Sequence, residues 1–217
     1  MSRKSKAVSS QGTHFYIQLI DAVGSAKTIT GISKANPAVV TSTAHGLATG
    51  DVVALAAIVG MVELNGLEVP IKVLTANTFE LCEVDSTAYT TWTSGGTATP
   101  FGFVESCQHK SYNFDDPGAA EQDVTTLCSE EKEFDIGLPD PGTFTADMHY
   151  VENDPAHIEL DTARSDGLQR WFKIKKRNGY FKVYYGAVKS FNDSGAVDGR
   201  NTGSLSIRIS GKKYSVV

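Results

Sequence analysis

The sequence predicts an all-β protein with one short α-helix and a small β module inserted into the chain. Leu205, Ile207 and Ile209 alternate with polar residues, which is the two-residue period of a strand that buries one face. An Asn-Gly pair at residues 178–179 separates two apolar and aromatic runs, a pattern typical of a β-hairpin. One segment, residues 155–166, instead has the start and stop signals of a helix.

The amino-terminal part, residues 1–27, is expected to hold an arm and the first strand of the main domain. We predict that strand at residues 14–20. Before it, Arg3, Lys4 and Lys6 are charged and no apolar run follows them, so a signal peptide is not expected. Two interpretations stay open: a flexible tail, or an arm that becomes ordered on a neighbouring subunit.

Residues 28–99 differ from the rest because they are rich in Thr, Gly, Val and Ala and poor in charge. Short strand candidates are separated there by turn signals such as Asn-Pro, His-Gly and Asn-Gly. These candidates are residues 39–42, 52–58, 69–74 and 78–82. We therefore predict a small β domain that is inserted into the main domain and lies outside it, which the chain tolerates if the ends of the insertion are close together.

The remainder of the main domain is predicted over residues 100–217, starting with a strand at Phe101 and Phe103. A later strand alternates polar and apolar residues, and its apolar members are Phe144, Ala146, Met148 and Tyr150. Between this strand and the hairpin, the helix over residues 155–166 begins after Asp154, a suitable N-cap, and can end at Gly167. Its apolar residues on one face are Ala156, Leu160 and Ala163. This helix should pack against the side of a sheet.

A basic hairpin is predicted over residues 170–188, with a two-residue type I′ turn at its Asn-Gly pair. The corresponding register pairs Arg177 with Tyr180, Lys175 with Lys182 and Lys173 with Tyr184. The opposite face would enter the core with Phe172, Ile174, Phe181, Val183 and Tyr185. The basic and aromatic face suits either single-stranded nucleic acid or acidic residues of another subunit. The sequence pI of about 5.5 favours the second.

Residues 113–133 form a long, acidic stretch with no sustained period, and in a compact domain such a loop is usually functional or disordered. Residues 164–217 carry 12 Lys and Arg against 3 Asp and Glu, whereas the preceding part is acidic. From charge alone we favour the interpretation that both sets face water, the alternative being that these unlike charges meet between copies of the chain. The predicted inter-subunit residues are Arg3, Lys4, Lys6, Asp115, Asp116, Glu121, Asp123, Glu130, Glu131, Glu133, Lys173, Lys175, Arg177 and Lys182.

We expect no catalytic, metal or cofactor-binding set, and we do not expect an enzyme. The sequence has neither a phosphate-binding glycine loop nor a nucleophile elbow, and no apolar run reaches the length of a membrane helix. The widely spaced Cys82, Cys107 and Cys128 are interpreted as reduced, partly buried thiols.

The histidines offer one combination that would in principle bind a metal. It consists of Asp147, His149 and His157, but we favour a solvated strand face and a helix start for these residues. For His45, at the junction of a strand and a turn, local hydrogen bonding is expected.

Several stretches resemble the tail tube proteins of long-tailed, siphovirus-type phages. Residues 123–144 (DVTTLCSEEKEFDIGLPDPGTF) are similar to the segment that follows the long loop in that family, and residues 190–211 (SFNDSGAVDGRNTGSLSIRISG) to its closing hairpin. With the helix, the likeness covers residues 14–22 and 101–211. Residues 28–69, with an AHGL..GD turn and a later ELNG, resemble a small β module found in many phage virion proteins.

This resemblance implies a β-sandwich flanked by a helix, in a subunit whose strands complete an inner β-barrel within a hexameric ring. Rings would stack into the tube of a virion tail, after assembly in the host cytoplasm. The implied partners are copies of the chain itself, the tail terminator, the tape measure and the tail tip or baseplate proteins. DNA would pass through an acidic lumen without specific binding, and neither a cofactor nor a membrane is implied.

Two rival functions are considered. The first is a carbohydrate-binding adhesin on the virion surface, with Tyr89 and Trp92 of the module as a sugar platform, although packing at the end of the module is favoured for both. The second is a tail-associated hydrolase, for which the sequence offers no residue to nominate.

Overall fold

The computed structural model describes residues 10–195, 197 and 199–217, and it confirms an all-β class with one short α-helix. The helices are α1 (Pro155–Asp166) and a 3₁₀ turn, η1 (Val62–Leu64). The strands are β1 (His14–Val23), β2 (Lys27–Thr28), β3 (Gly31–Ile32), β4 (Val39–Thr41), β5 (Val52–Val59), β6 (Glu68–Thr75), β7 (Thr78–Leu81), β8 (Ser94–Ser106), β9 (His109–Asp115), β10 (Glu121–Asp123), β11 (Phe134–Ile136), β12 (Thr143–His149), β13 (Arg170–Lys175), β14 (Phe181–Ser194) and β15 (Thr202–Val216).

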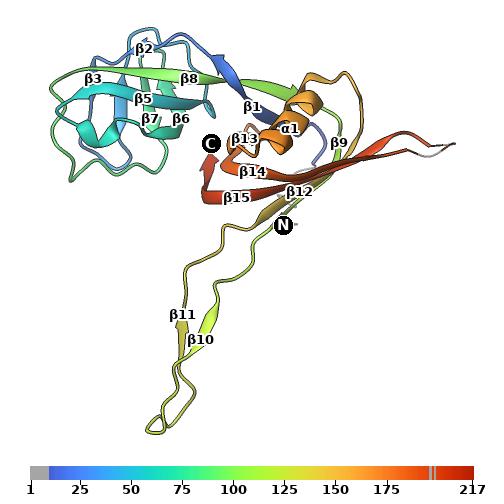
Figure 1. Cartoon of the computed structure of the whole chain (residues 1–217). Coiled ribbons are helices and arrows are strands. Elements are labelled where there is room, and N and C mark those ends of the chain that lie inside the picture. Colours follow the sequence, from blue (N-terminus) through green and yellow to red (C-terminus); the bar gives the residue numbers. More distant parts are fainter. Residues whose placement is uncertain (1–9, 196, 198) are drawn as a thin grey trace, which may run out of the picture.

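In the described residues, the strands form one large antiparallel sheet and one small ribbon (Figure 1). The large sheet has the order β3-β4-β7-β6-β5-β8-β1-β13-β14-β15-β12-β9, with β2 paired to β8. The ribbon consists of β10 and β11. The large sheet stays open, because β3 and β9 end it and do not pair with each other.

The main core lies inside the curve of the second half of this sheet. Phe15 of β1 and Phe144 of β12 are four strands apart in the sheet order, yet their ring centroids are 5.7 Å apart, so the sheet bends around the core. The predicted apolar positions of β12 and β15 are buried in it, as expected from their alternation.

Helix α1 covers this core and confirms its predicted bounds. The Asp154 carboxylate accepts hydrogen bonds from the backbone nitrogens of Ala156 (2.9 Å) and His157 (3.2 Å), and Gly167 ends the helix in the left-handed conformation (φ 67°). The predicted apolar face is fully buried against the sheet, where α1 packs on β1, β8 and β14.

A second core is formed wholly by residues between Ile29 and Ala98. Strands β4 to β7 lie within one or two residues of the predicted positions. His45 makes the expected local hydrogen bonds, because its Nδ1 accepts from Leu47 N (3.0 Å) and its Nε2 lies 3.1 Å from Thr75 O. Tyr89 and Trp92 pack against this core, which is the role favoured for them over a sugar platform.

A third, smaller cluster joins the two cores. Val52 and Cys82 of the inserted part pack there against Trp171, Val183 and Val216 of the main domain. The Trp171 indole also donates to Glu68 Oε2 at 2.7 Å. The inserted residues are therefore docked on the outer face of β13 and β14 as well as connected through the chain.

The register of the basic hairpin differs by one residue from the prediction. Lys175 lies opposite Phe181 and Lys173 opposite Val183. The chain turns through a longer loop than a two-residue type I′ turn: Lys176 N donates to Tyr180 O (2.8 Å), and Gly179 has a φ of 81°. A shift of one residue moves each side chain of a strand to the other face relative to its partner.

The predicted basic and aromatic face is consequently absent. Tyr184 is fully buried in the main core beside Phe172, while Val183 enters the third cluster on the opposite face. Both faces of the hairpin are therefore covered. Because Tyr184 is buried, it is not available to stack on a nucleic-acid base, and of the two tyrosines that suggested nucleic-acid binding only Tyr180 remains near the surface.

The cysteines are also placed differently from the prediction. All three are free; Cys82 is buried, whereas Cys107 and Cys128 are exposed. Burial raises the pKa of the Cys82 thiol to about 12, which keeps it protonated and inert at neutral pH. In the part of the chain that the structure describes, none of the helices has the length and apolar character needed to span a bilayer.

Candidate assembly surfaces

A two-stranded arm, residues 116–142, extends from the main domain (Figure 1). It leaves from the paired ends of β9 and β12, where Asp115 lies opposite Thr143. Further out, β10 and β11 pair through Glu121 with Ile136 and Asp123 with Phe134. The predicted irregular loop, residues 113–133, therefore includes β10, the first strand of a ribbon whose second strand, β11, directly follows the loop. The sequence did not indicate this ribbon.

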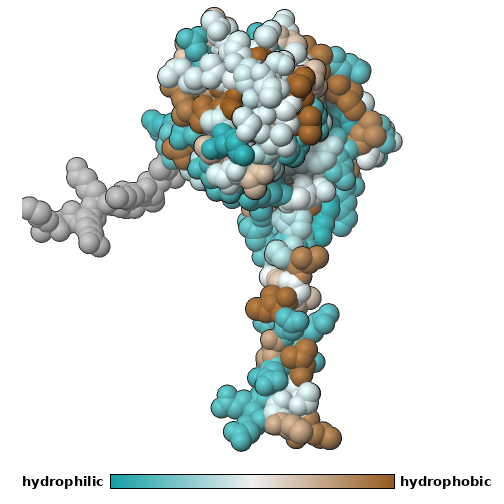
Figure 2. Space-filling view, turned by 90° about the vertical axis from the view of Figure 1, so that its left-hand side faces the viewer, coloured by the Kyte–Doolittle hydropathy of each residue, from teal (hydrophilic) through white to brown (hydrophobic). Residues whose placement is uncertain are grey.

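Apolar side chains lie exposed along this arm, and Figure 2 shows them as brown patches on its narrow extension. Leu127 and Leu138 have relative accessibilities of 108% and 94%. The other exposed apolar residues of the arm are Val124, Phe134 and Ile136. A lone two-stranded ribbon has no core in which to bury such residues, and exposed apolar groups of this kind mark interaction sites. These residues were missed at the sequence level because they follow no period.

Some acidic residues of the arm already bind partners within the chain, whereas others are exposed. Asp116 forms an ion pair with Lys213 of β15. Hydrogen bonds from Thr125 lower the pKa of Asp123, so this carboxylate stabilises the turn at the end of β10. The Glu133 carboxylate accepts a hydrogen bond from Ser129 Oγ at 3.3 Å. The other predicted acidic residues are exposed: Asp115 and Glu121 on the side of the arm nearer the main domain, and Glu130 and Glu131 near its tip.

The predicted basic residues divide in the same way. Lys173 is 9% exposed and pairs with Asp51 inside the chain, so its charge is already neutralised there. The Lys182 ammonium lies 4.2 Å from the centre of the Phe114 ring, and burial lowers its pKa. Lys175 and Arg177 stay exposed at the end of the hairpin.

The open basic residues border a shallow hollow of about 510 Å³. Its lining residues are Gln11, Gly12, His14, Lys175, Lys176 and Arg177. The predicted Arg3, Lys4 and Lys6 lie outside the described residues. The hairpin end therefore offers a positive surface beside the first described residues of the chain.

Two sheet edges of the main domain are also free within the described residues. Strand β9 pairs with β12 on one side and ends the sheet on the other. The second half of β8 pairs with β1 through Phe103 to Ser106, and β5 reaches β8 only up to Pro100. Unpaired backbone groups along such edges are a template for strands of another chain.

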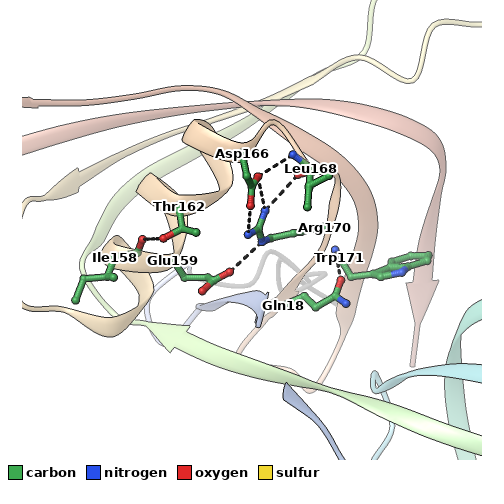
Figure 3. A network of polar contacts seen from close by, with 8 residues as sticks. All are labelled: Gln18, Ile158, Glu159, Thr162, Asp166, Leu168, Arg170 and Trp171. Atoms are coloured by element: carbon green, nitrogen blue, oxygen red, sulfur yellow. Dashed lines mark hydrogen bonds and ion pairs between the residues drawn. The ribbon is translucent and has the colours of Figure 1, made fainter. Parts of the chain in front are cut away.

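A buried ionic network links α1 to β13 (Figure 3). Arg170 of β13 is fully buried and donates to Glu159 Oε1 (2.9 Å) and Asp166 Oδ2 (2.7 Å), both on α1. Its hydrogen bonds lower the pKa of Asp166. Where β1 and β13 stop pairing, the Gln18 side chain accepts from Trp171 N (2.9 Å) and so continues the contact between the two strands.

The structure does not gather the metal trio considered from the sequence. Asp147 accepts a hydrogen bond from Ser111 Oγ (2.9 Å), and His157 Nδ1 lies 3.2 Å from the Val151 backbone nitrogen. Among the described residues, a different group has ligand atoms within 4.8 Å of one another: His14, Glu105 and Cys107. Sequence reasoning missed this group because 91 residues separate His14 from Glu105.

The class that the fold defines is an open, antiparallel all-β protein with one helix. Within it, residues 35–101 match the family model of the ubiquitin-activating enzyme E1 FCCH domain, which is not a phage tail tube family. The match spans less than half of the chain and lies almost entirely within the inserted part. No curated protein matches the chain.

This match corrects one expectation from the sequence. The expectation that the chain is not an enzyme is contradicted, because the matched family is a domain of an enzyme. Residues 35–101 are similar to a domain that belongs to an enzyme.

Proposed function

We propose that this chain is the structural subunit of a phage tail tube, which self-assembles into stacked, hexameric rings around a hollow conduit for the genome. The observation that carries the proposal is the arm with its exposed apolar side chains, Leu127 and Leu138 above all. Burying each of these against a neighbouring subunit would contribute about 2 kcal/mol.

Contacts within a ring would use the free edges of the main sheet. Strand β9 and the second half of β8 each present an unpaired side, so the edge of one subunit is available to a strand of the next. Ring closure would remove both exposed edges at once.

Contacts between rings would join the arm to the basic end of the hairpin. The open carboxylates Glu130 and Glu131 lie near the tip of the arm, whereas Lys175 and Arg177 lie on the main domain. Two unlike surfaces of this kind suit a head-to-tail stack, since each subunit offers one surface to the ring above and the other to the ring below.

The proposal also implies a position for the inserted part, a set of partner proteins and a place of action. The inserted part, residues 28–99, would decorate the outside of the tube, because a module in the lumen would obstruct DNA. The partners would be the tail terminator, the tape measure and the tail tip or baseplate proteins. The place of action would be the virion tail, with assembly in the host cytoplasm.

Sedimentation velocity and negative-stain microscopy of the purified chain at increasing concentration test the proposal. Rings or hollow filaments are expected for the wild type. The double variant Leu127→Ser with Leu138→Ser should shift the protein to monomers while leaving its circular dichroism unchanged. The matched control Val62→Ser removes an exposed apolar side chain from the inserted part, and it should assemble like the wild type. A wild-type chain that stays monomeric at every concentration would overturn the proposal.

A further inference from the structure

Three metal-binding side chains meet on one face of the β1–β8 ladder. Tyr16 lies opposite Glu105 and Phe15 opposite Ser106 in this antiparallel pair. Side chains alternate between faces along a strand, so His14 shares a face with Tyr16, and Cys107 shares a face with Glu105. The pairing therefore brings residues from two distant parts of the chain to one point.

The three ligand atoms lie close enough together to share one metal ion, because all are within 4.8 Å of one another. Cys107 Sγ lies 3.2 Å from Glu105 Oε1 and 3.8 Å from His14 Nδ1, and His14 Nδ1 contacts Glu105 Oε1 directly. Ligand atoms on one tetrahedral Zn²⁺ lie about 3.3–3.8 Å apart, given metal–ligand bonds of about 2.0–2.3 Å. A bound ion would therefore require the His14 and Glu105 side chains, both partly exposed, to move apart while Cys107 Sγ stays close to its present distance from each.

We propose that His14, Glu105 and Cys107 bind one Zn²⁺ ion, with the fourth position open to water or another ligand. A thiolate, an imidazole and a carboxylate are the three ligand types that Zn²⁺ uses in proteins. Thiolate and imidazole also select against Mg²⁺ and Ca²⁺, which prefer oxygen ligands. Lys175 lies opposite His14 on β13, but its ammonium lies over the Phe181 ring, 5.7 Å from the ring centre.

At this position, a bound ion would connect two separate parts of the main sheet. Cys107 starts the short connection between β8 and β9, and β9 is the free edge of the main sheet. A bound ion would fasten this connection to the start of β1. This inference goes beyond the proposed function and does not depend on it, because the three ligands belong to one described subunit.

Cobalt binding to the reduced, full-length protein tests the site, and the chain supplies its own control. Co²⁺ should give tetrahedral d–d bands and a thiolate-to-cobalt charge-transfer band at one equivalent. Cys107→Ser should abolish the charge-transfer band and weaken binding by more than about 100-fold, the upper limit for losing an outer partner of a ligand. Cys128→Ser removes the other exposed thiol and should change neither property. Absence of the band in the wild type, or an equal band in Cys107→Ser, would overturn the proposal.

A second measurement needs no variant. Zn²⁺ should slow iodoacetamide labelling of Cys107 by at least about tenfold, because a metal-bound thiolate is a poorer nucleophile, while labelling of Cys128 in the same molecule continues at its metal-free rate. Mass spectrometry of the two peptides reports both rates. Equal rates with and without Zn²⁺ at Cys107 would contradict metal binding, even if the Cys107→Ser variant failed to fold.

Discussion

Lys173 Nζ lies 3.3 Å from Asp51 Oδ1, and this partly buried ion pair links strand β13 of the main domain to the turn before β5 of the inserted part. The ammonium also lies over two aromatic rings, 4.3 Å from the centre of Phe103 and 5.2 Å from the centre of Tyr16. Burial lowers the pKa of Lys173, and Asp51 partly offsets this effect. The pair thus helps to fix how the inserted part is docked.

Removing the carboxylate from this pair should be costlier than removing the ammonium. Asp51→Asn leaves a buried, uncompensated lysine and should lower the free energy of unfolding by about 3 kcal/mol. Lys173→Met keeps the apolar stem and leaves only the more exposed Asp51 unpaired, so a loss of about 1 kcal/mol is expected. Urea denaturation of both variants compares the two values. The reverse ranking would show that burial of Lys173 does not require the pair.

Tyr184→Phe should stabilise the protein. The Tyr184 hydroxyl is buried in the main core and has no hydrogen-bond partner among the described residues. An unsatisfied buried hydroxyl costs about 1–3 kcal/mol, so its removal should raise the free energy of unfolding by about 1 kcal/mol. Tyr180→Phe, at the half-buried end of the hairpin, is the matched control and should change stability by less than about 0.5 kcal/mol. A destabilised Tyr184→Phe variant would mean that the hydroxyl has a partner in solution.

The network around Arg170 should make the fold sensitive to acid. Hydrogen bonds from Arg170 lower the pKa of Asp166 in the folded state. A lowered folded pKa contributes stability that is fully present above the unfolded value, about 3.9, and is lost as the pH falls through the folded value. Thermal unfolding between pH 7 and pH 2.5 should therefore show a smaller acid-induced loss for Asp166→Asn than for the wild type, from a lower stability at pH 7. Parallel curves for the two proteins would assign the acid sensitivity to other groups.

Charge reversal at the end of the hairpin should weaken assembly without affecting folding. Lys175→Glu with Arg177→Glu turns the exposed basic surface acidic, so it should repel the open carboxylates of a neighbouring arm. We expect polymerisation to require at least about tenfold more protein at low salt, with a smaller difference at 0.5 M NaCl because salt screens exposed charges. Lys34→Glu, exposed on the inserted part, controls for net charge. Normal polymerisation of the double variant would show that assembly does not depend on charge pairing between the hairpin end and the arm.

Much of the local structure could be predicted from the sequence, because its signals act within a few residues. Asp154, Pro155 and Gly167 specify both ends of α1 through hydrogen bonds and backbone conformations of their own segment. Strands β4 to β7 of the inserted part were likewise bounded by their turns. Part of the role of His45 followed from its position beside a turn, since its Nδ1 accepts from Leu47 N, whereas its Nε2 lies against Thr75 O, 30 residues away.

Features that depend on distant residues could not be predicted in this way. The hairpin register follows from which residues fill each face: Tyr184 enters the main core, and Val183 packs against the inserted part. An Asn-Gly pair is compatible with loops of more than one length, so the turn alone does not select the register. The cluster of His14, Glu105 and Cys107 could not be predicted for the same reason, because only the pairing of β1 with β8 brings these residues together.

The sequence by itself determined the all-β class, both ends of α1, and the positions of strands β4 to β7. Only the tertiary structure decided that the acidic stretch is a ribbon with exposed leucines, that Lys173 is buried, and that three metal-binding side chains converge. The physical reason is the distance along the chain over which each interaction acts. Caps and turns depend on neighbouring residues, whereas burial, strand register and ligand sets depend on contacts between residues that are far apart in the sequence.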